Sequence, residues 1–334
     1  MAIKKSELYS SIWQACDQLR GGMDASQYKD YVLVLLFVKY VSDKYGNDPD
    51  PVIVIPTGDE PGKGGSFKDM IHWKGKDNIG DELNKIIGSL ASANGLKGVI
   101  DVTDFNDSEK LGKGKDMVDR LSKLIAIFEK PELDFRKNRA EGDDLLGDAY
   151  EYLMKNFAVQ SGKSKGQFYT PAEVSRVMSK VIGIGAASRA DQSVYDPTCG
   201  SGSLLIKAAY EAPVKITVFG QEMDNSMAGL AKMNMILHDI PTAEIYKGNT
   251  LSSPGFKKQD GNLMIFDFAV ANPPFSVKNW RDGFNPEQDL YGRFDGFGIP
   301  PSKNGDYAFL LHFIKSLKST GKGAIILPHG VLFR

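Results

Sequence analysis

Residues 264–275 read Met-Ile-Phe-Asp-Phe-Ala-Val-Ala-Asn-Pro-Pro-Phe, and this stretch decides how the second half of the chain folds. The apolar run up to Ala271 is typical of a buried strand. Proline has no N–H to donate to a neighbouring strand, so the strand must end at Asn272. We therefore expect the tetrapeptide Asn272-Pro273-Pro274-Phe275 in a loop at the carboxyl end of a strand.

The tetrapeptide combines an amide oxygen, backbone carbonyls without a sheet partner and an aromatic face. This set suits a planar amino group. Asn272 and the carbonyl of Pro273 would accept its two hydrogens, and Phe275 would stack on the attached ring. The alternative is that Pro273 and Pro274 only terminate the strand.

The region after Gly166 alternates short apolar runs with amphipathic segments, which favours an open, mostly parallel α/β sheet. Ligands of such sheets bind at the carboxyl ends of the strands. The strands expected from this pattern are 193–195, 216–220, 244–246, 263–270 and 324–327. The expected helices are 171–184, 203–211, 225–237 and 307–319.

The first half of the chain is predicted to be helical, with an apolar helix from Tyr28 to Tyr45 as its longest element. Further helices are expected at 8–19, 81–93, 115–128 and 143–157, and a short strand at 52–55. A small, basic linker begins at Ser161. The sequence therefore predicts a helical domain over 1–160 and an α/β domain over 161–334.

The composition is that of an ordinary globular protein, with 42% hydrophobic and 25% charged residues and a net charge of -1. A protein that holds DNA alone usually carries a positive surplus, so a DNA-binding role would need a partner. Two cysteines and no signal-type or membrane-spanning apolar stretch indicate a cytoplasmic protein. The four histidines show no metal-ligand spacing, and we expect no metal.

The predicted turn after the first strand reads Asp196-Pro-Thr-Cys-Gly-Ser-Gly-Ser203. Gly200 and Gly202 let the backbone approach a ligand closely. A carboxylate at the mouth of the turn suits a ligand with a positive end, such as S-adenosylmethionine, better than a pyrophosphate. The alternative is a tight strand-to-helix turn in which Asp196 is a cap. The candidate cofactor contacts here are Asp196, Thr198, Gly200, Ser201, Gly202 and Ser203.

Two further candidates follow the next strands. Glu222, at the end of the second strand, is placed to accept both ribose hydroxyls of an adenosine. Asn249 follows the third strand, where its side chain would contact the adenine amino group. Asn249 is equally well interpreted as a turn residue.

Several segments together resemble the modification subunits of type I restriction–modification systems, which methylate adenine N6. In the helical part, the similar segments are 19–24, 28–33 and 36–42. Gly-Gln-Phe-Tyr-Thr-Pro at 166–171 is similar to the segment that leads into the catalytic domain of this family. The similarity covers the chain from Lys4 to its carboxyl end.

The resemblance implies a Rossmann-like S-adenosylmethionine-dependent methyltransferase domain behind an all-α domain. It implies cofactor contacts from Gln167, Phe168, Tyr169, Thr170, Pro171 and Ala172, and target-adenine contacts from Asn272 to Phe275. It also implies a site-specific adenine methyltransferase that flips a base out of double-stranded DNA. The implied partners are a specificity subunit, a second modification subunit and a motor–nuclease restriction subunit.

Two departures from the family matter. Asn249 stands where many relatives have Asp. The chain stops at Arg334, where relatives continue, so the closing strands of the sheet and a partner-docking region are expected to be absent. The alternatives are another amino-methyltransferase, acting on a protein glutamine or on RNA, and a catalytically incomplete assembly fragment.

The stretch from Ser276 to Asn304 is predicted to be a long loop. It mixes aromatic residues such as Trp280 and Phe294 with basic ones such as Arg293. This mixture suits an extruded base and its flanking phosphates. It equally suits a loop whose aromatic residues pin it to the domain.

Overall fold

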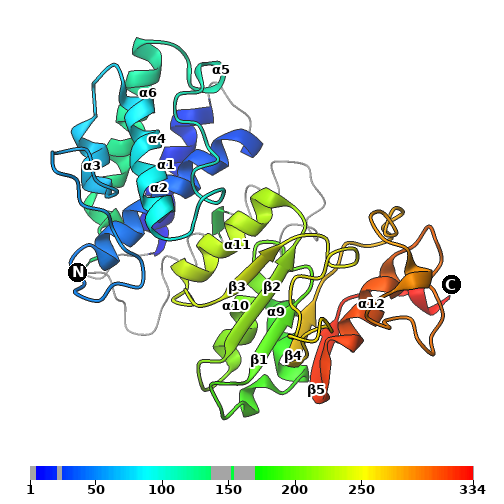
Figure 1. Ribbon diagram of the computed structural model, residues 1–334. Helices are drawn as coiled ribbons and strands as arrows, with labels where there is room; N and C mark the ends of the chain where they lie inside the picture. The colour runs from blue at the N-terminus through cyan, green and yellow to red at the C-terminus, as the bar shows by residue number, and fades with distance from the viewer. Residues whose placement is uncertain (1–4, 21–24, 137–151, 154–169, 334) are drawn as a thin grey trace. The chain divides into compact units, whose positions relative to one another are not determined.

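The structure is a computed structural model that describes residues 5–20, 25–136, 152–153 and 170–333. The chain divides into two compact units, Met1–Gly162 and Lys163–Arg334. Figure 1 shows both units, and each is described by itself below.

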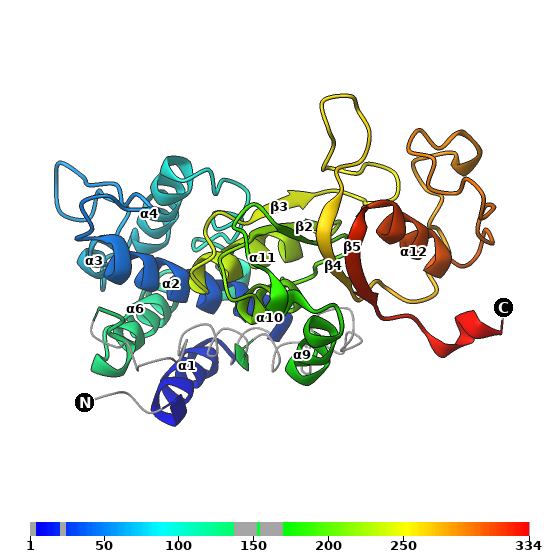
Figure 2. The ribbon, with the colours of Figure 1, turned by 90° about the horizontal axis from the view of Figure 1, so that it is seen from below.

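The first unit is built from helices around the apolar helix α2 (Ala25–Tyr45). From Tyr31 to Val38 every residue of α2 is buried, as expected of a helix that is apolar all round. Helices α1, α3 and α6 pack against it (Figure 2). The other elements of the unit are α1 (Lys5–Arg20), α3 (Phe67–His72), α4 (Ile79–Ala93), α5 (Ser108–Leu111), α6 (Lys115–Phe128) and the 3-10 turn Pro131–Leu133.

One predicted element of this unit is wrong. Residues 52–55 form no strand. Val52 and Val54 are exposed, and the backbone N–H and carbonyl of Val54 bond to the side-chain amide of Asn94 instead of to a strand. Of the helix predicted over 143–157, only Tyr152 and Leu153 lie within the described residues, and both are helical. None of the helices in the described part of the chain combines the length and the apolar composition that a bilayer crossing requires.

The second unit contains a sheet of five parallel strands in the order β3-β2-β1-β4-β5 (Figure 1). The strands are β1 (Ser193–Asp196), β2 (Thr217–Glu222), β3 (Glu244–Lys247), β4 (Phe266–Ala271) and β5 (Leu317–Ile325). The helices are α9 (Ala172–Val181), α10 (Ser203–Glu211), α11 (Asn225–Leu237) and α12 (Asp306–Lys315). Short 3-10 turns lie at Ile184–Ala186, Pro286–Gln288 and His329–Leu332.

Alternate residues of the strands supply two cores, as the period of two in a strand requires. Val194 and Val218 pack in a cluster with side chains of α9, α10 and α11. Their neighbours Tyr195 and Phe219 belong to an aromatic cluster with Phe266. The predicted parallel α/β architecture is therefore confirmed.

The boundary between α12 and β5 differs from the prediction. The helix ends at Lys315 and the strand starts at Leu317, whereas the sequence favoured a helix to Ser319 and a strand only from Ala324. This part of β5 is polar, glycine-rich and half-exposed. It lies at the edge of the sheet and pairs with β4 alone, through a register shift. Backbone hydrogen bonds to one neighbour thus define a strand that side-chain periodicity does not reveal.

The stretch 276–304, called the 276–304 loop below, packs on a small hydrophobic core of its own. Trp280 and Phe294 are buried in it against Leu251, Phe309 and Leu311. The indole N–H of Trp280 donates to the carbonyl of Pro301 at 2.8 Å. These aromatic side chains pin the loop to the domain.

Arg293 is buried beneath the same loop, with 2% of its surface exposed. Its guanidinium donates to Oδ1 of Asp289 at 2.7 and 3.0 Å and to Oδ2 at 3.2 Å. Burial of the Asp289 carboxyl opposes its ionisation, but the hydrogen bonds from Arg293 outweigh burial and leave its pKa below the usual value. Arg293 also lies 3.4 Å from Nδ1 of His312. Burial, and then this guanidinium, lower the pKa of His312 to about 3, so the ring is neutral near pH 7.

Replacing Arg293 by Met should destabilise the second unit by about 3–5 kcal/mol, because the Asp289 carboxylate would stay buried without its partner. The measurement is urea denaturation followed by Trp280 fluorescence, with Trp13 and Trp73 replaced by Phe so that Trp280 is the remaining tryptophan. Adding Asp289→Leu to Arg293→Met should recover much of the loss. A double variant as unstable as the single one would contradict this interpretation.

Candidate active site

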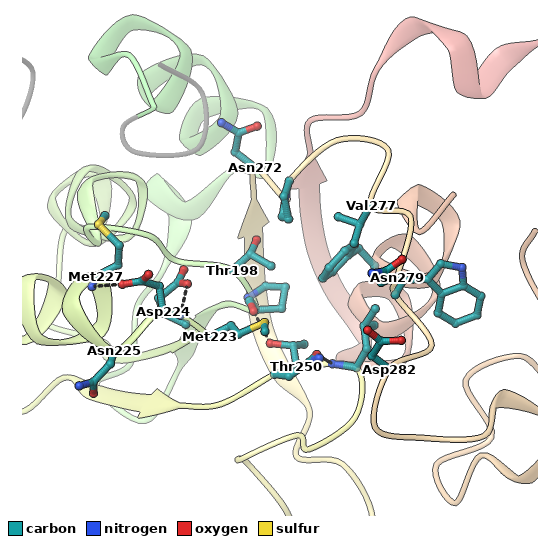
Figure 3. A pocket seen from close by; sticks show the side chains of 17 residues that line it. Thr198, Met223, Asp224, Asn225, Met227, Thr250, Asn272, Val277, Asn279 and Asp282 are labelled. Carbon is teal, nitrogen blue, oxygen red and sulfur yellow. Dashed lines mark hydrogen bonds between the residues drawn. The ribbon is translucent and has the colours of Figure 1, made fainter. Parts of the chain in front are cut away.

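The carboxyl ends of β1, β2, β3 and β4 meet around a cavity of about 790 Å³ (Figure 3). This volume lies in the range of small-molecule sites. In Figure 3, Met223 and Asp224 stand on one wall, and Asn279 and Asp282 on the opposite wall. The cavity is lined by Pro197, Thr198, Glu222, Met223, Asp224, Asn225, Met227, Asn249, Thr250, Leu251, Asn272, Pro274, Val277, Asn279, Trp280, Asp282 and Phe309.

The turn after β1 is held in a conformation that needs its two glycines. Gly200 and Gly202 have φ values of 54° and 81°, which other residues adopt only with strain. A Cβ on Gly202 would also stand 2.8 Å from Cε of Met235. Gly202 is the N-cap of α10, which begins at Ser203. Ser201 and Ser203 are buried and hydrogen-bonded to each other, so they shape the turn from inside.

Asp196 ends β1 and is buried, with 1% of its surface exposed. Its carboxylate accepts the backbone N–H of Thr198 at 2.8 Å, which is the geometry of a cap on the turn. Burial of the carboxyl group, and beyond it the nearby charge of Glu222, raise the pKa of Asp196 to about 8. Thr198, at the same turn, lines the cavity, whereas Asp196 lies behind it.

Glu222 lines the cavity and connects the turn after β1 with the turn after β2. One carboxylate oxygen accepts the N–H of Gly200 at 3.0 Å, and the other accepts the N–H of Asp224 at 2.8 Å. Burial raises the pKa of Glu222 against these hydrogen bonds. The side chain is thus fixed at the end of β2, the position where a ribose is expected to bind.

The loop after β3 is anchored by Gln221, which is fully buried. Its amide nitrogen donates to the carbonyls of Gly248 and Ser253, and its oxygen accepts the N–H of Gly255 at 3.0 Å. Within this loop, the side-chain oxygen of Asn249 accepts the N–H of Leu251 at 2.9 Å. Asn249 therefore makes the hydrogen bonds of a turn residue, while it also lines the cavity.

The tetrapeptide leaves the sheet at the end of β4, beside the turn after β1. Asn272 and Pro274 line the cavity, and Pro273 is buried. The amide nitrogen of Asn272 donates to the hydroxyl of Thr170 at 3.3 Å. This contact takes the donor end of the amide, whereas an amino group needs its acceptor end. Phe275 is 49% exposed and stands outside the cavity lining.

The remaining predicted contacts precede β1. Thr170 is buried and touches Asn272, as described above. Pro171 is the N-cap of α9 and Ala172 its first residue. Gln167, Phe168 and Tyr169 lie outside the described residues.

The charge of the cavity favours a cationic ligand. Among the described residues, its lining includes the carboxylates Glu222, Asp224 and Asp282 and neither lysine nor arginine. A pyrophosphate would be repelled there, whereas an ammonium or sulfonium group would be attracted. With the glycine turn and Glu222 at the ends of β1 and β2, these residues fit S-adenosylmethionine.

Several residues of the site have no clear signal in the sequence. Met223, Val277 and Asn279 line the cavity but match no motif. Gln221 gives one usable sign, since it is a polar residue inside an otherwise apolar strand and must find buried partners. The sequence alone does not show which loop such a residue anchors, because its hydrogen-bond partners are known only from the structure.

The parallel sheet, with this cavity at the carboxyl ends of its strands, defines an S-adenosylmethionine-dependent methyltransferase domain. The family model N-6 DNA Methylase matches residues 141–334, and the HsdM N-terminal domain model matches residues 8–128. These two matches cover the second unit and most of the first unit.

Relatives agree with the family models. The type I restriction enzyme MpnII methylase subunit of Mycoplasma pneumoniae is 32% identical over 99% of this chain and 69% of its own length. The MjaVII methylase subunit of Methanocaldococcus jannaschii is 32% identical over 77% of this chain and 41% of its own. The crystal structure of a type I restriction–modification methyltransferase subunit from Streptococcus thermophilus superimposes with a TM-score of 0.81 at 28% identity, covering 99% of this chain and 76% of that one.

The chain therefore belongs to the family of type I restriction enzyme methylase subunits. It spans 58 to 62% of the length of two further relatives from Methanocaldococcus jannaschii. The predicted family resemblance is confirmed.

Replacing Asp196 by Asn should change how stability depends on pH. Between the unfolded pKa near 3.8 and the folded pKa of about 8, the folded state holds a proton on Asp196 that the unfolded state has lost. The free energy of unfolding should therefore fall as pH rises through this window, by up to about 1.4 kcal/mol per pH unit. Asp196→Asn lacks this contribution. The free energy of unfolding of the variant, minus that of wild type, should therefore grow from pH 4 to pH 8.

The measurement is urea denaturation of both proteins at one-unit pH intervals, again followed by Trp280 fluorescence. Groups that do not act on Asp196, such as His312, contribute to both curves and cancel in the difference. Parallel curves across the window would show that Asp196 titrates normally in the folded protein.

Proposed function

We propose that this chain is the catalytic part of a site-specific DNA methyltransferase that modifies adenine N6 in a type I restriction–modification system. One observation carries the proposal. Asn272 and Pro274 of the tetrapeptide line one acidic cavity together with Glu222, and Pro197 and Thr198 line it from the turn after β1. This arrangement supports an amino-group acceptor beside a cofactor site, which methyl transfer requires. Membership of an N-6 DNA methylase family favours DNA over RNA or a protein glutamine as the substrate.

The target amino group is a poor nucleophile, because its lone pair is delocalised into the adenine ring. Bound S-adenosylmethionine supplies an electrophilic methyl group next to it. The side-chain oxygen of Asn272 and the carbonyl of Pro273 accept the two N6 hydrogens and thereby turn the lone pair toward the methyl carbon. Positive charge grows on N6 during transfer, and both of these dipoles would stabilise it. The amino proton becomes acidic only after transfer, so no general base is needed.

The target base must leave the duplex to reach Asn272, at a cost of a few kcal/mol. Phe275 is placed to offset part of this cost by stacking, which contributes roughly 1–3 kcal/mol per base. Its half-exposed ring next to Pro274 is accessible to a base that enters from solvent.

The cofactor contacts in this proposal come from the turn after β1, from Glu222 and from the segment 167–172. Glu222 would accept the ribose hydroxyls, and Thr198 would face the cofactor from the turn. Asn249 would contact the adenine through the part of its amide that the loop backbone does not use.

The net charge of -1 supports a division of labour in DNA binding. Phosphate contacts supply most of the affinity of DNA-binding proteins, and this chain has no surplus of positive charge. We infer that it works in the cytoplasm with a specificity subunit, a second modification subunit and a motor–nuclease restriction subunit, and that the specificity subunit reads the DNA sequence.

Asn272→Ala should reduce methyl transfer by at least 10²- to 10³-fold, because it removes one of the two dipoles that stabilise the charge on N6. The protein is co-expressed with its specificity subunit in bacteria that lack adenine methylation, and N6-methyladenine is mapped by single-molecule sequencing. Wild type should methylate one adenine in a recurring sequence, and the variant should leave that sequence unmodified.

Calorimetry with S-adenosylmethionine is the control. Asn272→Ala should bind the cofactor within a few-fold of wild type, since Asn272 is assigned to the target base. Full methylation by the variant, or methylation of cytosine instead of adenine, would refute the proposed function.

A further inference from the structure

Ser276 follows the tetrapeptide directly and has an unusual backbone conformation. Its φ is 54°, and among the described residues only Asp239 shares a positive φ without being glycine. Such a residue is strained and persists only where its surroundings hold it. The other positive-φ residues of the 276–304 loop are glycines, at 283, 292, 296 and 298. The chain thus uses glycine elsewhere in this loop and accepts strain at the point that adjoins Phe275.

Asp306 holds Ser276 in this conformation. Its carboxylate accepts the backbone N–H of Ser276 at 2.7 Å, and 1% of its surface is exposed. Asp306 is the first residue of α12, so its position is fixed by a helix that packs into the core through Phe309 and Phe313. The strained residue is therefore tied to a rigid element of the fold.

A second hydrogen bond closes the loop at the same place. The N–H of Gly305 donates to the carbonyl of Val277 at 3.0 Å. A Cβ on Gly305 would stand 2.8 Å from Cβ of Trp280. The chain at Gly305 therefore passes close to the chain at Trp280. We call these two contacts, Ser276 with Asp306 and Val277 with Gly305, the neck of the 276–304 loop.

We propose that the neck is a positioning device for the tetrapeptide, in which Asp306 and Ser276 set the direction of Phe275 and of the chain that carries Asn272. This inference rests on the proposed function, because it assumes that the tetrapeptide binds the target base. Asp306 is a positioning residue, since its carboxylate is buried and acts through the backbone of Ser276.

The loop does not need the neck in order to fold. Trp280 and Phe294 bury its core, and the pair of Arg293 with Asp289 anchors it. A glycine at 276 would relieve the strain while keeping the N–H that Asp306 accepts. The strained serine therefore makes the chain more rigid directly after Phe275. A Phe275 ring that is already held in place loses less entropy when a base stacks on it.

The test compares Asp306→Ala, Asp306→Asn and Ser276→Gly in the complex with the specificity subunit. The substrate is a duplex with the methylated sequence found by sequencing, and a second duplex carries 2-aminopurine at the target adenine. The readouts are the single-turnover transfer rate, the KM for DNA, 2-aminopurine fluorescence and the Kd of S-adenosylmethionine. Glu287→Ala is the matched control, because Glu287 is an exposed carboxylate of the same loop outside the neck.

Asp306→Ala should slow transfer at least tenfold and leave the Kd of the cofactor within twofold of wild type. Asp306→Asn keeps an oxygen acceptor and should recover transfer to within about threefold. Ser276→Gly should raise the melting temperature yet slow transfer by threefold or more, a combination that a merely structural role would not produce. In Asp306→Ala the fluorescence of 2-aminopurine should be weaker than in wild type, because a misplaced Phe275 stabilises the flipped base less.

Wild-type transfer and fluorescence in both Asp306→Ala and Ser276→Gly, with Asn272→Ala inactive, would overturn the role of the neck and leave the proposed function standing. If Asp306→Ala does not fold, the result for Ser276→Gly alone tests the role of the neck. Slower transfer with a higher melting temperature supports the neck, and unchanged transfer overturns it. An active Asn272→Ala would overturn the proposed function and the neck's role with it.

Discussion

The inability of Pro273 to donate a hydrogen bond is the constraint on which the rest of the site depends. β4 lies between β1 and β5, and it pairs with β1 up to Ala269 and with β5 up to Ala271. Beyond Asn272 the chain cannot continue the ladder and must leave the sheet. Because all five strands are parallel, it leaves at the edge where the turn after β1 also lies. The proximity of Asn272 to the cofactor turn thus follows from strand order together with one missing donor.

The loops around the cavity are then held by buried polar side chains, each of which binds backbone groups of another loop. Gln221 holds the loop after β3, Glu222 holds the turn after β1, and Asp306 holds the start of the 276–304 loop. A buried polar group is costly unless it is hydrogen-bonded, so each of these contacts restricts its loop to a narrow range of conformations. The site is built from loops, yet its geometry is set by strands and helices.

The sequence predicted the parts of this structure that depend on local pattern. β1, β2, β3 and α11 stand within a few residues of their predicted ranges, because their apolar residues follow the period of a strand or a helix. β5 was misplaced, since its pairing with β4 leaves no apolar pattern. Arg293 resembled a surface phosphate contact and is instead buried on Asp289. Contacts of this kind join a loop to a core and depend on tertiary packing, which residue spacing does not encode. The neck between Ser276 and Asp306 spans 30 residues and was invisible for the same reason.

The acidic lining of the cavity also bears on how the protein would handle DNA under the proposed function. Glu222, Asp224 and Asp282 attract a cationic cofactor and repel phosphate. A flipped adenine is neutral and can enter, whereas the backbone that carries it is held at the mouth. The cavity therefore discriminates between base and backbone by charge, and it gains no affinity from phosphate contacts. Since the chain as a whole has a net charge of -1, the proposed function requires other subunits to supply the attraction that brings DNA to this mouth. Separation of catalysis from DNA affinity is thus a consequence of the same carboxylates that make the cofactor site.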